Sequence, residues 1–293
     1  MELRQLRYVE AVARHRHFTR AAEELHVAQS ALSHQVRRLE AELGVELFER
    51  TSRHVAATEA GEAVAARARR ILAEVDGARE EVEELQGVIR GHVSIGALLT
   101  AGEIDFPRLM AAFSAAYPGI EVGFREGTAG DMFGYLARDE VDVAFAMLAG
   151  SPPQDLVVER LSEDELVAVF PPGGAPAKGS VRAADLREHP IVAPRSGSAV
   201  KQAVDEFFAA AGEPLRVSLE SGEPFLLRCL VAGGVGAAVL PSSLTRREGP
   251  PVEVRSLRPR VRLPVALLWR EQRHSSPAAR AFIEFARREA PAR

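Results

Sequence analysis

Apolar side chains in the first 43 residues recur every three or four positions, the spacing of amphipathic helices. This pattern predicts three helices, over residues 2–14, 20–25 and 29–43. Thr19 is expected to cap the second helix, and Gly44 to end the third. The chain therefore begins with a small bundle of short helices.

The third predicted helix has two unlike faces. Leu32, Val36 and Leu39 fall on one face, which is expected to pack on the bundle core. The other face carries hydrogen-bonding side chains, namely Ser30, Ser33, His34 and Arg37. Such a face suits the major groove of DNA, where base edges and phosphates accept hydrogen bonds. A solvated face on any small bundle fits the spacing equally well.

Two short strands are expected next, over residues 45–48 and 55–57, around a basic tip. Arg50 and Arg53 lie in this tip, where they would reach phosphates or the minor groove. A plain hairpin with exposed arginines is the alternative interpretation.

A long helix without proline is predicted over residues 58–86, with Thr58 as its cap. Apolar residues alternate along it at spacings of four and three, which is the heptad pattern of a coiled coil. The members of this seam are Val64, Ala68, Ile71, Val75, Ala78, Val82, Leu85 and Ile89. The pattern favours a dimer formed through this helix, and packing on its own domain is the alternative.

From His92 onward, strand-like runs alternate with amphipathic helices, a pattern typical of parallel α/β structure. The expected strands cover residues 92–98, 120–125, 141–147, 165–170, 191–193, 237–240 and 265–269. The expected helices cover residues 104–116, 131–138, 225–231 and 277–288, and residues 195–198 open a further helix that runs through Ala211.

Open α/β sheets bind ligands at the carboxyl ends of their strands, where loops lead into helix N-termini. Unpaired N–H groups and the helix dipole favour anions there. The loop residues predicted to form such a site are Thr100, Ala101, Thr128, Ser196, Gly197 and Ser198. Glu223 and Phe225 are expected on the far wall. Each hydroxyl alone also fits a simple helix cap.

The net charge of −4 gives no bulk sign of a nucleic-acid binder, so any DNA affinity must come from locally placed arginines. Residues 1–60 hold nine Arg and nine Asp or Glu. No apolar run reaches the roughly 18 residues that a membrane helix needs, and the charged start is unlike a signal peptide. A cytoplasmic protein without membrane contact is expected.

Enzyme signatures are weak. The glycines at 233, 234 and 236 follow a helix and precede a strand, the reverse of a dinucleotide-binding loop. Ser196 lacks the context of a nucleophile elbow, and Cys229 fits a core thiol. The histidine spacings match no usual metal motif. We expect no catalytic residues, no cofactor and no metal.

The stretch FTRAAEELHVAQSALSHQVRRLEAELGVELFER, residues 18–50, and the TEAG that starts at Thr58 resemble the LysR-type transcriptional regulators. The resemblance implies an α+β multidomain protein. A winged helix-turn-helix would occupy residues 1–58, and a linker and dimerisation helix residues 59–90. A two-subdomain effector domain, like periplasmic solute-binding proteins, would occupy residues 91–293. Its subdomain I would comprise residues 91–161 and 267–293, and its subdomain II residues 162–266.

The resemblance also implies roles for individual residues. The DNA-binding positions would be Thr19, Arg20, Gln29, Ser30, Ser33, His34, Arg37, Arg50 and Arg53. The chain departs from the family at Ala28, where Ser or Thr usually caps the recognition helix. The implied partners are a pseudo-palindromic DNA duplex, a second copy of the chain in a dimer or tetramer, and a small-molecule effector. A small organic anion is the expected effector.

Two other interpretations were weighed. A free-standing solute-binding module would lack residues 1–90 and carry a secretion signal, and neither is so. A constitutive DNA binder with a vestigial cleft remains open. The effector, the target promoter and the direction of regulation are left open by the sequence.

Overall fold

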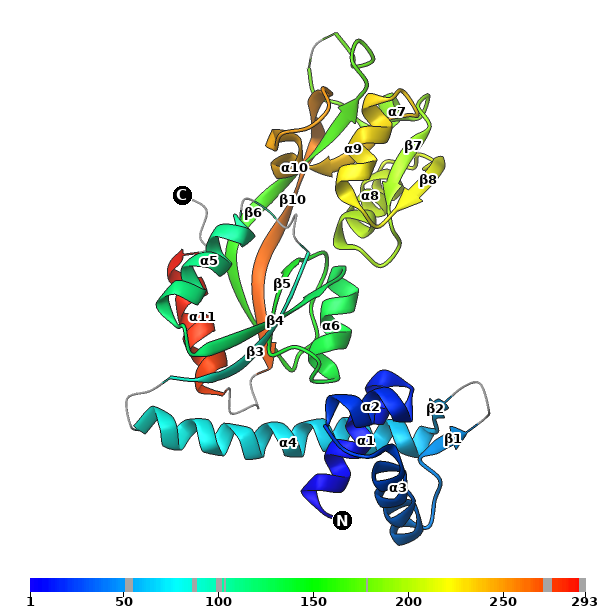
Figure 1. Ribbon diagram of the computed structural model, residues 1–293. Helices are drawn as coiled ribbons and strands as arrows, with labels where there is room; N and C mark the ends of the chain where they lie inside the picture. Colours follow the sequence, from blue (N-terminus) through cyan, green and yellow to red (C-terminus); the bar gives the residue numbers. More distant parts are fainter. Residues whose placement is uncertain are drawn as a thin grey trace. The chain divides into compact units, whose positions relative to one another are not determined.

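The computed structural model describes residues 1–50, 55–85, 89–98, 102, 104–177, 179–270 and 276–289. The chain forms two compact units, Met1–Val88 and Ile89–Arg293 (Figure 1). Each unit has its own hydrophobic core, and each is described here by itself.

The first unit is a helix-turn-helix followed by a hairpin and one long helix. Its elements are α1 (Leu3–His15), α2 (Phe18–Glu24), α3 (Gln29–Leu43), β1 (Phe48–Arg50), β2 (Val55–Ala57) and α4 (Glu59–Leu85). The three short helices match the predicted ones closely. One expected cap is wrong: α2 begins at Phe18, and the side chain of His17 accepts the N–H of Arg20 at 3.4 Å. Thr19 lies inside the helix and is exposed.

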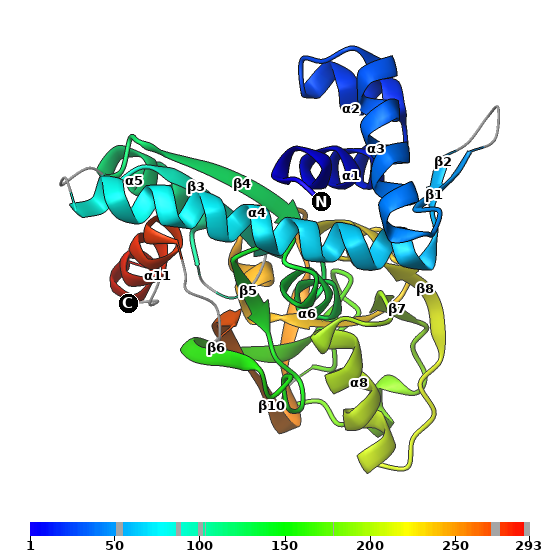
Figure 2. The same cartoon turned by 90° about the horizontal axis from the view of Figure 1, so that it is seen from below.

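The start of α4 is fixed against the hairpin by Thr58 and Gly61. Thr58 Oγ1 donates to the carbonyl of Glu46 at 2.7 Å and accepts the Gly61 N–H at 3.0 Å. A Cβ on Gly61 would lie only 1.9 Å from the carbonyl oxygen of Leu47. The glycine is therefore required by the close approach of helix and hairpin, which Figure 2 shows from below.

The predicted seam of α4 divides into two parts. Ala68 is fully buried, and Val64 packs against the core of the first unit. Farther along, Ile71 and Val82 are 37 % and 56 % exposed. Ile89 packs against the core of the second unit instead. Val64 therefore contacts the core of its own unit, and the seam as a dimer contact stays a prediction.

The second unit contains the α/β part of the chain. Its strands are β3 (Gly91–Ala97), β4 (Ile120–Glu126), β5 (Val143–Met147), β6 (Leu156–Phe170), β7 (Ile191–Pro194), β8 (Val217–Ser221), β9 (Ala238–Pro241) and β10 (Glu253–Arg270). Its helices are α5 (Phe106–Ala116), α6 (Ala129–Ala137), α7 (Ala183–Leu186), α8 (Ala199–Ala210), α9 (Pro224–Ala232), α10 (Ser242–Arg246) and α11 (Pro277–Glu289).

Two long strands connect two lobes. The main sheet has the order β4-β3-β5-β10-β6-β9, with β3 parallel to β4 and β5, and β10 antiparallel to β5 and β6. The strands β7 and β8 pair in parallel as a second sheet. The chain crosses between the lobes along β6 and returns along β10 (Figure 1). The predicted strands covered only the ends of β6 and β10, and β8, α7 and α10 were not predicted.

Each lobe packs on aliphatic and aromatic side chains. In lobe I, which holds β3 to β5, the ring of Phe113 meets that of Phe282 edge-on at 4.9 Å and joins α5 to α11. In lobe II, which holds β7 to β9, Val192, Leu227 and Leu240 share a buried cluster. Over the part of the chain that the structure describes, no helix is long and apolar enough to cross a membrane.

Candidate DNA-reading surface and effector cleft

Helix α3 is buried along one face and exposed to solvent along another. Leu32, Val36 and Leu39 are fully buried in the core of the first unit, as predicted. The exposed residues of the predicted reading surface are Gln29, Ser30, His34 and Arg37. Ser33, also predicted for this surface, is only 8 % exposed, and its role in DNA binding stays a prediction. Thr19 and Arg20 of α2 are exposed.

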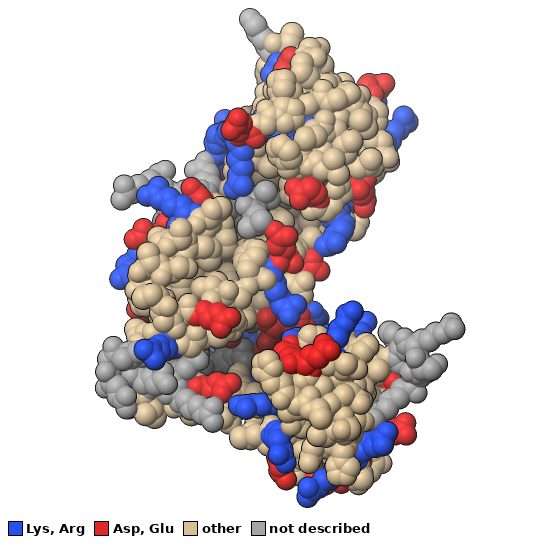
Figure 3. Space-filling model, viewed as in Figure 1, with Lys and Arg blue, Asp and Glu red and all other residues tan. Residues whose placement is uncertain are grey.

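The charges on the first unit are mixed. Arginine and acidic side chains lie close together on its visible surface (Figure 3). On this face the described residues place cationic side chains among acidic ones (Figure 3). Phosphate contacts would have to come from single arginines such as Arg37.

The ends of α3 are defined differently. At its start, Ala28 is in an extended conformation, and no side-chain hydrogen bond caps the helix. At its end, Gly44 adopts φ 71° and its N–H donates to Glu40. The side chain of Glu40 accepts the N–H groups of Leu47 and Phe48 at 3.0 and 3.3 Å, which ties α3 to the hairpin.

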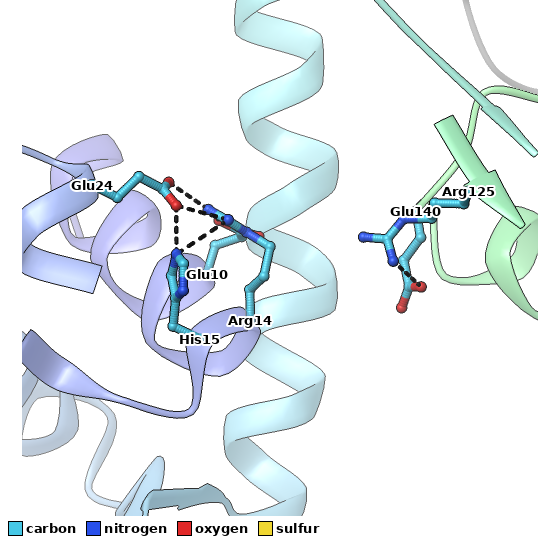
Figure 4. Close-up of polar contacts among 6 residues, drawn as sticks. All are labelled: Glu10, Arg14, His15, Glu24, Arg125 and Glu140. Carbon is cyan, nitrogen blue, oxygen red and sulfur yellow. Dashed lines mark hydrogen bonds and ion pairs between the residues drawn. The ribbon is translucent and has the colours of Figure 1, made fainter. Parts of the chain in front are cut away.

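A cluster of charges joins α1 to α2 (Figure 4). Arg14 donates to both oxygens of Glu24, at 2.6 and 2.9 Å, and to Glu10 at 3.1 Å. His15 Nε2 lies 2.5 Å from Glu24. The hydrogen bonds from Arg14 and then from His15 lower the pKa of Glu24 to about 2. The cluster therefore ties the end of α1 to the end of α2.

Of the two hairpin arginines, the structure describes only the backbone of one. Arg50 ends β1, and its side chain lies outside the described part. Arg53 lies outside the described residues, as do Thr100 and Ala101 of the expected effector loop. Their predicted roles stay predictions.

A cavity of about 40 Å³ lies between the two lobes of the second unit. Most of its lining is aliphatic, contributed by Leu98, Met147, Val200, Leu227, Leu240 and Leu244 among others. The polar residues on its wall are Thr128, Arg195, Ser198 and Ser221. A water needs roughly 10–15 Å³ on this measure, so the cleft has room for a few waters.

Two of the expected effector residues meet at this cavity because both cap helices that point toward it. Thr128 caps α6 in a capping box with Asp131, and Ser198 caps α8 by accepting the N–H of Lys201 at 3.1 Å. Gly197 adopts φ 85° in the loop before α8. Ser196 is exposed and donates to Glu220 at 3.4 Å.

Glu223 and Phe225 do not lie on the cavity wall. The Glu223 side chain caps α9 by accepting the N–H of Phe225 at 3.0 Å, and Phe225 is 45 % exposed. Their neighbours Pro224 and Leu227 line the cavity instead. Pro224 and Leu227 are three residues apart and share one side of α9, whereas Phe225 lies on another side.

Arg195 was not among the expected site residues. Its Nη2 donates to Asp131 Oδ2 at 2.8 Å, so it joins lobe II to lobe I beside the cavity. The N–H of Thr128, followed by its hydroxyl and by Arg195, holds the pKa of Asp131 below its ordinary value. The only sequence signal was a cation directly before a Ser-Gly-Ser loop.

The described residues form no recognisable metal site. Among these residues, no group of three or more His, Cys, Asp and Glu side chains is placed to hold a metal ion. Cys229 is a half-buried free cysteine.

Comparison with known proteins agrees with both units. Residues 3–62 match the family described as "Bacterial regulatory helix-turn-helix protein, lysR family", and residues 86–291 match "LysR substrate binding domain". An anchored reading helix, a hairpin, a long helix and a two-lobed α/β unit define a DNA-binding regulator with a ligand-binding domain. The chain belongs to the LysR family of transcriptional regulators.

Individual relatives match over nearly the whole length. The RuBisCO operon transcriptional regulator of Allochromatium vinosum is 35 % identical, over 99 % of this chain and 97 % of its own. Full-length OxyR from Pseudomonas aeruginosa superposes with a TM-score of 0.77 at 29 % identity, covering 99 % of this chain and 94 % of its own. Full-length CbnR in complex with its target DNA gives a TM-score of 0.68 at 25 % identity, covering 99 % and 100 %.

Proposed function

We propose that this chain regulates transcription by placing the exposed face of α3 in the major groove of a promoter site. The observation that carries the proposal is the geometry of α3. Its apolar side is locked into the core, while Gln29, Ser30, His34 and Arg37 are exposed. Amide, hydroxyl and guanidinium groups are the side chains that read base edges and hold phosphates.

The relatives support this assignment. CbnR, a full-length regulator of similar fold, has been crystallised with its target DNA. By analogy, α3 of this chain would enter the groove, and the hairpin that carries Arg50 and Arg53 would reach the backbone beside it.

A dimer fits this function. One short helix reads few base pairs, and two copies reading half-sites of a pseudo-palindrome gain specificity. The exposed apolar residues Ile71 and Val82 of α4 supply a surface for the second copy. Tetramers would follow from contacts beyond α4.

The cleft between the lobes is the proposed effector site. It combines an aliphatic wall with two helix caps, Thr128 and Ser198, and the cation Arg195. This combination suits a small organic anion with an apolar body. Effector binding would change the arrangement of the lobes and thereby the affinity of the protein for DNA or the bending of the bound DNA. The coupling free energy between the two sites would be about 1–3 kcal/mol. We expect the protein to act in the cytoplasm without catalysing a reaction.

Selection from fragments of the host genome tests the DNA assignment. The full chain is incubated with the fragments at two salt concentrations, and bound fragments are sequenced and footprinted. We expect enrichment of a few promoter fragments, each with a protected pseudo-palindrome. Uniform recovery of all fragments, with no protected site, would refute sequence-specific binding.

A further inference from the structure

Buried side-chain oxygens without a hydrogen-bond partner gather at one place in the second unit. Among the residues that the structure describes, these atoms are Ser162 Oγ, Asp164 Oδ2, Glu165 Oε1 and Ser243 Oγ. The first three belong to residues 162–165 of β6, and the fourth belongs to α10. Buried polar groups in proteins are nearly always paired, so this cluster marks a place where a ligand would supply the missing donors.

Two of these residues, Asp164 and Ser243, are in direct contact. Asp164 is 2 % exposed, and its Oδ1 accepts the hydroxyl of Ser242 at 2.9 Å and the N–H of Ser243 at 3.2 Å. Its Oδ2 has no partner in the described part of the chain, and neither has the hydroxyl of Ser243, although Ser243 is only 5 % exposed. Burial of a carboxylate is costly unless a cation or hydrogen-bond donors replace the lost water. The pair therefore favours a positively charged donor.

Ser243 lines a pocket of about 430 Å³, which is large enough for a small organic molecule. The apolar part of the pocket wall is formed by Ile104, Phe106 and Pro107, around the start of α5. No described residue lines both this pocket and the cavity beside Arg195. Adjacent residues of α10 face the two spaces, since Leu244 lines the cavity and Ser243 lines the pocket. The pocket is therefore a separate site.

We propose that this pocket binds a small molecule that carries a protonated primary amine. An ammonium group has three N–H donors and no acceptor, which suits oxygens that lack donors. One N–H donates to Ser243 Oγ, and the buried carboxylate of Asp164 directly behind Ser243 attracts the charge. The apolar body of the ligand packs on Ile104, Phe106 and Pro107. The inference goes beyond the proposed function, because it uses neither the DNA-reading surface nor the cavity beside Arg195.

The other charged residues of the pocket wall permit a cation. Arg246 and Arg247 are exposed, so water and salt screen their repulsion, whereas the buried carboxylate of Asp164 is screened much less. Asp105 adds a second carboxylate to the wall, and its Oδ1 caps α5 by accepting the N–H of Arg108 at 3.1 Å. A positive charge next to Ser243 is therefore attracted more strongly than it is repelled.

Calorimetric titration of the full chain with propylammonium chloride, at constant ionic strength in sodium chloride, tests the inference. Two matched probes are tetramethylammonium chloride, a cation without N–H donors, and 1-propanol, which has the same apolar body without the charge. We expect propylammonium to bind at least tenfold more tightly than either probe, since only propylammonium forms charge-assisted hydrogen bonds. No binding of propylammonium at tens of millimolar, or equal affinity for the three probes, would overturn the proposal.

Two variants locate the bound amine. Asp164→Asn keeps an oxygen for the hydroxyl of Ser242 and the N–H of Ser243 but removes the negative charge, so propylammonium should bind at least tenfold more weakly. Ser243→Ala removes only the unpartnered hydroxyl and should weaken binding by about tenfold. Asp205→Asn is the matched control, because this carboxylate lies on α8 and does not line the pocket, and it should leave the affinity unchanged. Wild-type affinity in either folded pocket variant would overturn the placement of the amine.

Controls cover folding and the DNA assignment. Thermal unfolding without the amine checks that each variant is folded. If Asp164→Asn does not fold, Ser243→Ala decides the outcome, because it leaves both hydrogen bonds of Asp164 Oδ1 in place. Filter binding to a selected DNA fragment measures the proposed function separately. A chain that binds this fragment but shows no preference for propylammonium would contradict only the inference drawn from the pocket.

Discussion

Arg14, at the end of α1, donates hydrogen bonds to both carboxylate oxygens of Glu24, at the end of α2, over 2.9 and 2.6 Å. The two residues are ten positions apart, so the pair exists only because the helices pack together. It joins the two helices that precede α3, and its stabilising effect depends on the ionisation of Glu24.

The first prediction concerns pH. The pKa of Glu24 is lowered from 4.5 to about 2 in the folded chain. A carboxylate with a lowered pKa stabilises the fold fully above its unfolded pKa and loses that effect as the pH falls toward the folded value. We expect Glu24→Gln to lose up to about 1 kcal/mol at pH 7, since the pair is partly exposed.

Urea unfolding at pH 7, 5 and 3.5 measures this effect. The difference between wild type and Glu24→Gln should be constant from pH 7 to about 5 and should shrink by pH 3.5. A difference that stays constant across this range would show that Glu24 does not titrate as described.

The second prediction concerns Gly61. Gly61→Ala would drive a methyl group into the carbonyl oxygen of Leu47, 1.9 Å away, and should cost about 3 kcal/mol. Gly77 is the matched control on the same helix, because a Cβ there meets nothing within 4 Å. Gly77→Ala should stabilise the helix by about 0.5–1 kcal/mol. Similar thermal midpoints for the two variants would contradict the close contact between α4 and the hairpin.

The third prediction concerns the uncapped start of α3. Ala28 precedes the helix in an extended conformation and offers no side-chain acceptor. Ala28→Ser places a hydroxyl at this position and should stabilise the first unit by about 1 kcal/mol. Chemical unfolding measures the gain, and Ala31→Ser, inside the exposed face of the same helix, is the control that should bring none. Equal effects of the two serines would argue against capping.

The fourth prediction concerns the dimer. Ile71→Asp and Val82→Asp place a charge on the exposed apolar side of α4, and each should weaken the proposed dimer at least tenfold. Ala73 is exposed two residues beyond Ile71, roughly on the opposite side of the helix, so Ala73→Asp should have little effect. Sedimentation analysis across a concentration series gives the result. A wild-type chain that stays monomeric would remove the basis of the prediction.

Local periodicity was enough to predict the helices of the first unit. The spacing of Leu32, Val36 and Leu39 identified the buried side of α3 correctly. Ser33 lies between the two sides, three residues before Val36 and four before Arg37, so spacing alone does not decide how far it is exposed.

Features that depend on tertiary structure were harder to predict. The residues of β10 before Val265 include four arginines and two prolines, which hides a strand that pairs with β6 along nearly its whole length. The pairing of Arg195 with Asp131 joins residues 64 positions apart, and no local pattern reports it. Helix caps such as Thr128 and Ser198 could be predicted, because a cap depends only on a few residues that are adjacent in sequence.

The central claim is that the open face of α3 reads DNA, and Arg37→Ala tests it most directly. Fluorescence anisotropy with a selected genomic fragment and a scrambled duplex gives both affinities, and Arg108→Ala on α5 is a control that removes an exposed arginine from the other unit. Arg37→Ala should lose about 5- to 150-fold in affinity for the selected fragment, equivalent to about 1–3 kcal/mol, with an unchanged melting temperature. Arg37→Ala that binds the fragment as tightly as wild type, while remaining folded, would contradict the account.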